Sequence, residues 1–366
     1  MTRATDLDTP ALLVDLAVME RNLQGVADYA ARHGLRLRPH TKTHKSPRIG
    51  RRQLDLGAAG LTVAKVGEAE AMMSAEPPDL LVAYPVIGRA KLERLMGVAR
   101  RARVTVALDS LAAAEQLSEA ARGAGATVGV LAETDVGLGR VGVSPGAELL
   151  DLARGIERLA GLSFEGIAFY PGHIKDNGAA SREALAALGG LIRSILADFR
   201  RAGIQARIVS GGSTPSLYHS HELPGLNEIR PGTYVFNDWN TVASGACMPQ
   251  ECAATMLVTV VSTARPGQII VDGGSKTFSS DRPAGSGAEA TFGHVVEAPE
   301  AVFHKMNEEH GYVDVRQCGR KFEIGERLRI IPNHICVAVN LHERVYGIRG
   351  GEVEEVWEVA GRGKLQ

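Results

Sequence analysis

The sequence predicts an α/β protein in which a TIM-like (β/α)8 barrel is followed by a mostly antiparallel β domain. In roughly the first two thirds of its 366 residues, short apolar segments with strand character alternate with alanine-rich amphipathic segments. Strands that are apolar along their whole length are typical of parallel sheets covered by helices. After about residue 240 the helical periodicity is lost, and glycine and proline separate short segments that are typical of antiparallel strands.

Seven strand-like segments support the barrel. Amphipathic stretches such as residues 181–203 lie between them and predict the covering helices. Seven or eight strand–helix units in about 220 residues fit a closed barrel better than an open doubly wound sheet. The open sheet is the structural alternative, but no GxGxxG sequence follows the first strand. The seven segments are 35–39, 60–64, 80–84, 103–109, 127–133, 164–170 and 206–212.

The segments after residue 240 predict the second domain. They are short, and glycine or proline ends several of them. The predicted boundaries are 11–240 for the barrel and 241–366 for the β domain, with residues 1–10 packed with the β domain. The predicted strands are 255–264, 268–274, 326–332, 335–341, 344–351 and 355–361.

Composition and charge exclude several classes of protein. A chain with 45% hydrophobic and 23% charged residues is ordinary for a globular enzyme. The formal net charge of -1 gives no electrostatic reason to expect binding to nucleic acid or to an anionic membrane. No apolar run approaches the roughly 20 residues of a membrane span, and the N-terminus lacks the apolar region of a secretory signal. The four cysteines show no zinc-type spacing, so a reducing cytoplasm is expected.

The segment LRLRPHTKTHKSP, residues 35–47, crowds ionisable side chains just after the first barrel strand. Barrel enzymes place their chemistry at the C-terminal ends of the strands, so these side chains are expected at the catalytic mouth. A lysine there can form a Schiff base if burial and nearby positive charge lower its pKa. On these grounds Lys42 and Lys45 both qualify, and a solvated basic turn is the simpler alternative.

Two further segments suggest the partner of such a lysine. SGGST, residues 210–214, is a glycine-rich turn at a strand end whose backbone N–H groups could hold a phosphate. RPGTY, residues 230–234, is a second candidate. A lysine combined with a phosphate-binding turn on a barrel points to pyridoxal 5′-phosphate (PLP), which accepts electrons from the α-carbon of an amino acid.

Eight segments in the same order resemble one known family. They are TPALLVDL, LRPHTKTHKSP, GLTVAKVGEAEAM, GLGRVGV, GGSTPS, RPGTYVFND, VDGGSKTFSSD and PNHICVAVNL. Together they resemble the D-threonine aldolase and D-serine dehydratase family of fold-type III PLP enzymes, from Thr9 to about Gly363. The combination is specific, although each piece alone is not.

The resemblance implies an alanine racemase-type barrel, with Lys42 as the residue that carries PLP. It also implies that residues 11–15 pair with the β domain, and that the protein is a homodimer. Arg140 is either a cofactor-side arginine or an ion-pair partner of Asp135. The residues that match cofactor-binding positions are His40, Lys42, Arg140, Tyr170, Gly211, Gly212, Ser213, Thr214, Gly232, Thr233 and Tyr234.

His334 and Cys336 predict a metal site. Residues i and i+2 of a strand face the same side, so the two would present nitrogen and sulfur ligands suited to zinc. In the resembling family the same position is a metal site, His-x-Cys or His-x-Asp. The His-x-Cys form resembles zinc-dependent dehydratases, whereas the His-x-Asp form resembles aldolases that use manganese-like ions. FYPGH, residues 169–173, instead resembles the aldolases, and His173 is a general base, a metal-side residue or a loop histidine.

The resemblance therefore implies a PLP- and divalent-metal-dependent lyase, with zinc or manganese as the metal. The first expectation is retro-aldol cleavage of a D-3-hydroxy amino acid, with D-threonine giving glycine and acetaldehyde. His173 or a hydroxide on the metal would remove the β-hydroxyl proton. The alternative is dehydration of D-serine or a related D-3-hydroxy amino acid to a 2-oxo acid and ammonia, with Lys42 taking the α-proton. Two other functions are weighed. Racemisation fits the barrel, but racemases of this type need no metal, so the predicted metal pair argues against it. The small PLP-homeostasis proteins lack a C-terminal β domain, so the segments after residue 240 argue against that class.

Overall fold

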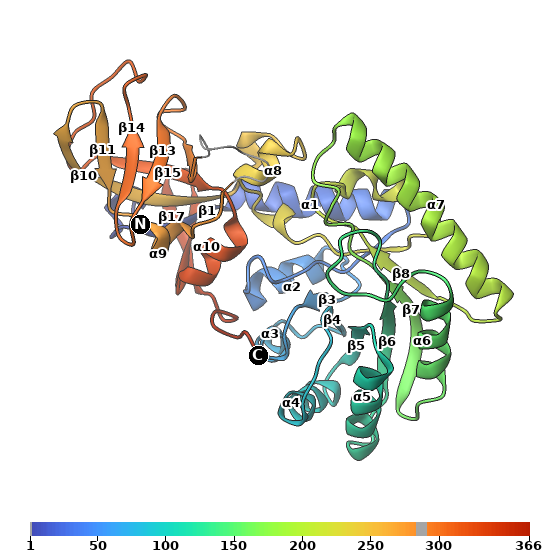
Figure 1. The fold of residues 1–366 in the computed structure, drawn as a ribbon. Coiled ribbons are helices and arrows are strands. Elements are labelled where there is room, and N and C mark those ends of the chain that lie inside the picture. Colours follow the sequence, from blue (N-terminus) through green and yellow to red (C-terminus); the bar gives the residue numbers. More distant parts are fainter. Residues whose placement is uncertain (1, 283–290) are drawn as a thin grey trace. The chain divides into compact units, whose positions relative to one another are not determined.

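The computed structural model describes residues 2–282 and 291–366, which fall into two compact units. The parallel unit comprises Gln24–Lys42, Ser46–Gly232 and Gly363–Gln366. The antiparallel unit comprises Met1–Leu23, Thr43–Lys45 and Thr233–Arg362. Figure 1 shows the elements of each unit, which are described separately below.

The parallel unit is built on an eight-stranded parallel sheet with the order β2-β9-β8-β7-β6-β5-β4-β3. Its curled edges meet, because Thr41 N–H donates to the Thr62 carbonyl (2.8 Å) and Thr62 N–H donates to the Pro39 carbonyl (2.9 Å). The α/β fold class is confirmed. The strands are β2 (Arg36–Leu37), β3 (Leu61–Val63), β4 (Asp79–Val82), β5 (Arg103–Leu108), β6 (Val128–Glu133), β7 (Leu162–Ala168), β8 (Ile208–Gly211) and β9 (Glu228–Ile229).

Helices follow most of these strands and lie along the sheet (Figure 1). One cluster of buried apolar residues runs across this sheet. Five adjacent strands, β4 to β8, each contribute one residue to the cluster. The cluster is Leu81, Ala107, Leu131, Ala168 and Ile208. The helices are α1 (Leu16–Arg32, shared with the antiparallel unit), α2 (Pro47–Asp55), α3 (Val66–Met72), η2 (Met73–Ala75), α4 (Arg89–Ala99), α5 (Leu111–Gly123), α6 (Ala147–Glu157), α7 (Ala179–Arg201) and η3 (Leu217–Glu222).

A charged network is buried inside the parallel unit. Arg38 is fully buried, and its guanidinium bonds Asp79 Oδ1 at 2.8 Å and Glu228 Oε2 at 3.0 Å. Ser210 Oγ donates to Glu228 Oε1 at 2.6 Å, and Arg230 Nη1 donates to Ser210 Oγ at 2.5 Å. Each buried charge therefore has a partner, which a low-dielectric interior requires.

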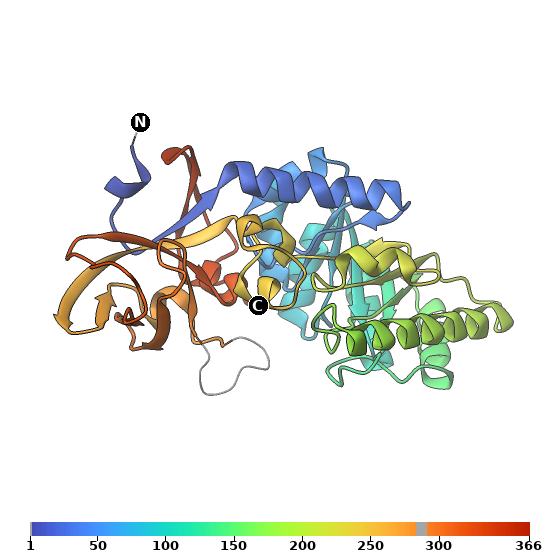
Figure 2. The ribbon, with the colours of Figure 1, turned by 90° about the horizontal axis from the view of Figure 1, so that it is seen from above.

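The antiparallel unit contains a nine-stranded sheet with the main path β13-β14-β11-β10-β1-β16-β17, and β15 joins β10 to β12. β1 (Ala11–Asp15) is antiparallel to β10 and parallel to β16, so the pairing expected for residues 11–15 is confirmed (Figure 2, blue beside gold). The other strands are β10 (Ala254–Arg265), β11 (Gln268–Val271), β12 (Gly293–Val295), β13 (Val302–Met306), β14 (Gly311–Asp314), β15 (Arg327–Pro332), β16 (Arg344–Arg349) and β17 (Glu352–Glu358).

One expected strand of this unit is a helix. Residues 335–341 form α10 (Ile335–Leu341), so the strand prediction was wrong. The buried residues Ile335, Ala338 and Val339 have the i, i+3, i+4 spacing of a helix face, which a short apolar run does not distinguish from a buried strand. The remaining helices are η1 (Ala4–Asp6), η4 (Thr233–Val235), α8 (Trp239–Ala243), η5 (Pro249–Glu251) and α9 (Ser275–Phe278).

Within residues 2–282 and 291–366, no helix combines the length and the apolar character that crossing a bilayer would require.

Candidate active site

Lys42 is an exposed residue whose chain neighbours on both sides are buried. Its backbone N–H donates to His40 Nδ1 at 3.3 Å, and within the described chain its ammonium has no hydrogen-bond or ion-pair partner. Lys45, by contrast, is buried and donates through Nζ to Asn340 Oδ1 at 2.8 Å. Of the two lysines that the segment offered, only Lys42 has an amine available for covalent chemistry.

The turn after β8 has the form of a phosphate site. Gly212 has φ +92°, a conformation that favours glycine, and a Cβ on Gly211 would lie 2.3 Å from the Phe169 ring. The backbone N–H groups of Gly212, Ser213 and Thr214 have no partner among the described residues. Three unpaired N–H groups in one turn fit the phosphate of PLP.

Buried hydroxyls and one arginine support this turn, and sequence reasoning missed two of them, Ser216 and Arg230. Ser213 Oγ and Ser216 Oγ are 3.0 Å apart, and both residues are buried. Arg230 donates to the Phe169 carbonyl at 3.1 Å as well as to Ser210 Oγ. Burial lowers the pKa of Arg230, while Glu133 opposes that change. RPGTY was chosen as a phosphate segment, but its arginine carried no assigned role.

Arg140 lies in the loop after β6, and Tyr170 and His173 lie in the loop after β7. Both loops belong to the parallel unit. The Arg140 guanidinium lies 4.9 Å from the centre of the Tyr170 ring. Asp135 instead accepts backbone N–H bonds of 3.0–3.1 Å from residues 137–139, and these bonds hold its pKa below the ordinary value. The ion-pair alternative for Arg140 is therefore not the arrangement seen.

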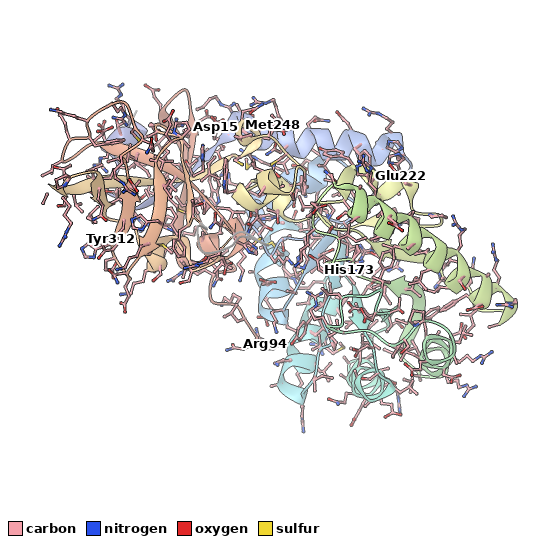
Figure 3. The ribbon with its side chains drawn as sticks, turned by 45° about the horizontal axis from the view of Figure 1, so that its top comes forward. Asp15, Arg94, His173, Glu222, Met248 and Tyr312 are labelled. Atoms are coloured by element: carbon pink, nitrogen blue, oxygen red, sulfur yellow. The ribbon has the colours of Figure 1, made fainter. Side chains whose placement is uncertain are left out.

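His173 has a buried ring nitrogen that is available for proton transfer. Its ring packs against Gly137, where a Cβ would come within 3.3 Å of Cε1. His173 Nδ1 is buried and, within the described residues, has no hydrogen-bond partner (Figure 3). An unpartnered buried nitrogen is costly unless a ligand or water completes it.

His334 and Cys336 are close together, although not for the predicted reason. His334 is the residue before α10 and Cys336 lies in its first turn, so strand alternation does not align them. Their side chains are hydrogen-bonded, which raises the pKa of His334 to about 9. Because a metal binds neutral imidazole and thiolate, it would displace the protons that this pair shares.

Carboxylates on either side hold the pair. Asp281 Oδ2 lies 3.2 Å from His334 Nδ1, where it can orient the imidazole. Asp238 is buried, accepts the Ile335 N–H at 3.1 Å and so fixes the start of α10; its pKa is raised by burial. Asp238 lies in the segment RPGTYVFND, but no sequence pattern connected it with residue 335.

The described residues contain no group of three or more His, Cys, Asp or Glu side chains arranged to hold a metal ion. A site on His334 and Cys336 would thus have two protein ligands. That leaves the positions that a catalytic metal gives to water and substrate. The residues present fit such a metal and fit PLP.

The predicted residues are divided between the two units. The parallel unit holds His40, Lys42, Arg140, Tyr170, His173, Gly211, Gly212, Ser213, Thr214 and Gly232, and the antiparallel unit holds Thr233, Tyr234, His334 and Cys336. Thr43, which directly follows Lys42, belongs to the antiparallel unit, and its Oγ1 lies 3.1 Å from Cys336 Sγ. Thr233 Oγ1 is 3.8 Å from the same sulfur.

Comparison with known proteins gives matches over nearly the whole chain. Residues 14–238 match the family model of the alanine racemase N-terminal domain, and residues 253–348 match the serine dehydratase domain. The D-threonine aldolase of an Arthrobacter species is 36% identical over 363 residues, covering 98% of this chain and 93% of the relative.

Two further matches include both reaction types. The D-threo-3-hydroxyaspartate dehydratase of Delftia sp. (strain HT23) is 33% identical over 352 residues, covering 90% of this chain and 91% of the relative. The crystal structure of D-threonine aldolase from Filomicrobium marinum is similar with a TM-score of 0.93 and 34% identity, covering 99% of this chain and 98% of that chain.

Proposed function

The chain belongs to the family of PLP-dependent lyases that includes D-threonine aldolases and D-hydroxy amino acid dehydratases, and from this premise we propose that it cleaves D-3-hydroxy amino acids by a retro-aldol reaction. With D-threonine, the Cα–Cβ bond breaks and the β-hydroxyl proton is lost. The products are acetaldehyde and, after Cα is protonated, glycine.

The contact between Thr43 and Cys336 carries the proposal. Thr43 Oγ1 is 3.1 Å from Cys336 Sγ, and consecutive Cα atoms are only about 3.8 Å apart. The backbone of Lys42 is therefore tied by the chain to the neighbourhood of the metal pair. This closeness along the chain supports a shared role for Lys42 and the metal pair in one reaction.

Each residue then has a stated task. Lys42 holds PLP, which when bound accepts the electrons released at Cα. The N–H groups of residues 212–214 hold the phosphate. His173 Nδ1 accepts the β-hydroxyl proton, for which its lack of a protein partner leaves it free. His334 and Cys336 would hold a metal, which when bound would make that proton more acidic, and Asp281 orients His334.

Dehydration of the same substrate class is the second candidate. Cys336 favours it, because the resembling zinc-dependent dehydratases carry His-x-Cys. In that reaction the α-proton goes to Lys42 and the β-hydroxyl leaves. The products are a 2-oxo acid and ammonia. Both reactions use the same residues, so the products decide between them.

A product assay with two detectors tests the proposal. PLP-loaded protein is given D-threonine or D-serine, with L-threonine as the stereochemical control, with and without EDTA. Acetaldehyde and glycine from D-threonine, lost with EDTA and restored by Mn²⁺ or Zn²⁺, are expected. A 2-oxo acid from either substrate would replace the aldolase assignment with the dehydratase. Absence of product from both D-amino acids would reject both.

A further inference from the structure

The antiparallel unit has a cavity of about 570 Å³ on the face of the sheet formed by β10, β11, β13 and β14. None of the residues assigned to the candidate active site lines it. Its lining includes the basic side chains of Arg265, His304, Lys305 and His310, together with Tyr312 (labelled in Figure 3). No carboxylate from the described residues is part of the lining.

The strand register explains why these side chains share one face. Ser262 pairs with Ile270, Ile270 pairs with Tyr312, and Tyr312 pairs with Lys305. These residues form a row across four strands, and paired residues point to the same side of a sheet. The ammonium of Lys305 is held 5.0 Å from the centre of the Tyr312 ring.

A bulge adds a second basic side chain next to Lys305. Consecutive strand residues normally face opposite sides, yet His304 and Lys305 both line the cavity. The register shifts between Phe303 and Lys305, so two residues of β13 oppose one of β14. Phe303 is fully buried on the other face, against Phe278. The bulge thus re-aims His304 while the core contact is kept.

The register of β10 against β11 also shifts, between Ser262 and Arg265. Arg265, which follows this shift, lines the same cavity. Two irregular strands therefore direct cationic side chains into one hollow. Bulges interrupt sheet hydrogen bonds and commonly re-aim functional side chains. This arrangement differs from a regular exposed sheet face with scattered lysines.

The acidic residues nearby are already engaged. Glu308 and Glu309 accept from Lys276 Nζ at 3.0 and 2.7 Å. Asp314 accepts from Arg316 Nε at 2.9 Å, and that side chain lowers the pKa of Asp314 to about 2. In the described part of the chain, the four basic residues of the cavity form no ion pair with a carboxylate. Among the described residues, the positive charges of Arg265 and Lys305 are therefore not paired with a carboxylate.

We propose that this cavity binds a small polyvalent oxyanion, a phosphate compound or a polycarboxylate. Arg265 and Lys305 supply the fixed charge, and Arg is suited to bidentate bonds with planar or tetrahedral oxyanions. His304 and His310 add imidazole N–H donors, and Ser262 adds a hydroxyl. The volume lies within the roughly 300–1,000 Å³ of small-molecule sites. The site is independent of the proposed lyase activity.

Calorimetric titration of PLP-saturated protein tests the site, because PLP keeps the turn at residues 211–214 filled. Inorganic pyrophosphate and citrate are the probes, at ionic strength matched with KCl. We expect one saturable site for at least one probe, and at least about tenfold weaker binding in the variant Arg265→Gln/Lys305→Met. Pyrophosphate alone would identify a phosphate site, and citrate alone a polycarboxylate site.

The control variant Lys91→Met/Arg101→Gln removes the same two charges from exposed positions of the parallel unit and should bind like the wild type. Equal affinity in the cavity variant and the control, or no saturable binding up to about 10 mM, would overturn the proposal. A second measurement needs no variant. Bound pyrophosphate or citrate should slow diethyl pyrocarbonate labelling of His304 and His310, and unchanged labelling by mass spectrometry contradicts the site.

Discussion

The two units place their charges differently. In the parallel unit the side chains of Arg38 and Glu228 are 0% exposed, and Asp79 is 10% exposed. In the antiparallel unit the Arg316–Asp314 and Lys276–Glu308 pairs lie at the surface, with the Arg316 side chain 73% exposed. Buried pairs fix geometry and are costly to break, whereas surface pairs contribute little.

The same contrast separates the two halves of the candidate active site. The proposed PLP-binding residues of the parallel unit are a glycine turn after β8, with the buried hydroxyls and Arg230 that support it. The metal half rests on the first turn of one short helix, fixed by a single buried carboxylate, Asp238. We infer that the PLP half is held by a network and the metal half by a few contacts. Four experiments test that difference.

Replacing Lys42 should have the largest effect. Lys42→Ala removes the amine that holds PLP, so activity should fall by about 10⁴-fold or more, and the visible absorbance of bound PLP should be lost. Absorbance spectra after gel filtration measure the second effect. Lys45→Ala is the matched control and should retain the band, because Lys45 bonds Asn340 instead. A band that persists in Lys42→Ala would reject Lys42 as the anchor.

Breaking the buried network should have the next largest effect. Arg38→Met leaves Asp79 and Glu228 buried without their shared partner and should cost about 3–5 kcal/mol of unfolding free energy. Urea unfolding followed by circular dichroism measures this. Arg316→Met, which removes an exposed pair, should change it by about 0–1 kcal/mol. Similar losses in both variants would remove the contrast between the units.

Replacing a metal ligand should affect chemistry without affecting PLP. Cys336→Ala removes one of two protein ligands, so metal content should drop and activity should fall by about 10²-fold. Elemental analysis and the PLP absorbance band are read on the same sample. Cys318→Ala, at a half-buried cysteine away from the helix start, should keep its metal. Full activity of Cys336→Ala would show that the pair binds no catalytic metal.

The smallest effect is expected from the carboxylate behind His334. Asp281→Asn keeps the size of the side chain but weakens its hold on His334 Nδ1, so metal affinity should fall by about tenfold. Competition with a fluorescent zinc chelator measures it. Asp176→Asn, an exposed aspartate of the parallel unit, is the control. An unchanged affinity would mean that His334 needs no such partner.

Much of the parallel unit was predictable because its strands are continuous apolar runs and its functional residues follow strand ends. Each of the seven expected segments overlaps a strand. β9 has only two residues, too few to give a pattern. The turn at residues 210–214 was chosen because glycines and hydroxyls follow a strand end there, although such turns are common.

The rest depended on contacts between residues far apart in the sequence. Asp238 reaches the backbone of Ile335, and Ser210 bonds Arg230; no local spacing encodes either contact. The segment 335–341 was read by its apolar composition rather than by its helical spacing. His334 and Cys336 nevertheless lie close together, because a residue pair two apart can meet in a strand or around a helix start.

β1 has a consequence for synthesis on the ribosome. Its partners, β10 and β16, are translated roughly 240 and 330 positions later, so β1 is made long before it can pair. The parallel unit can gain structure while the chain is still being extended. The antiparallel unit instead must wait until β16 has been made, and until then the apolar β1 segment stays open to chaperones and to wrong partners.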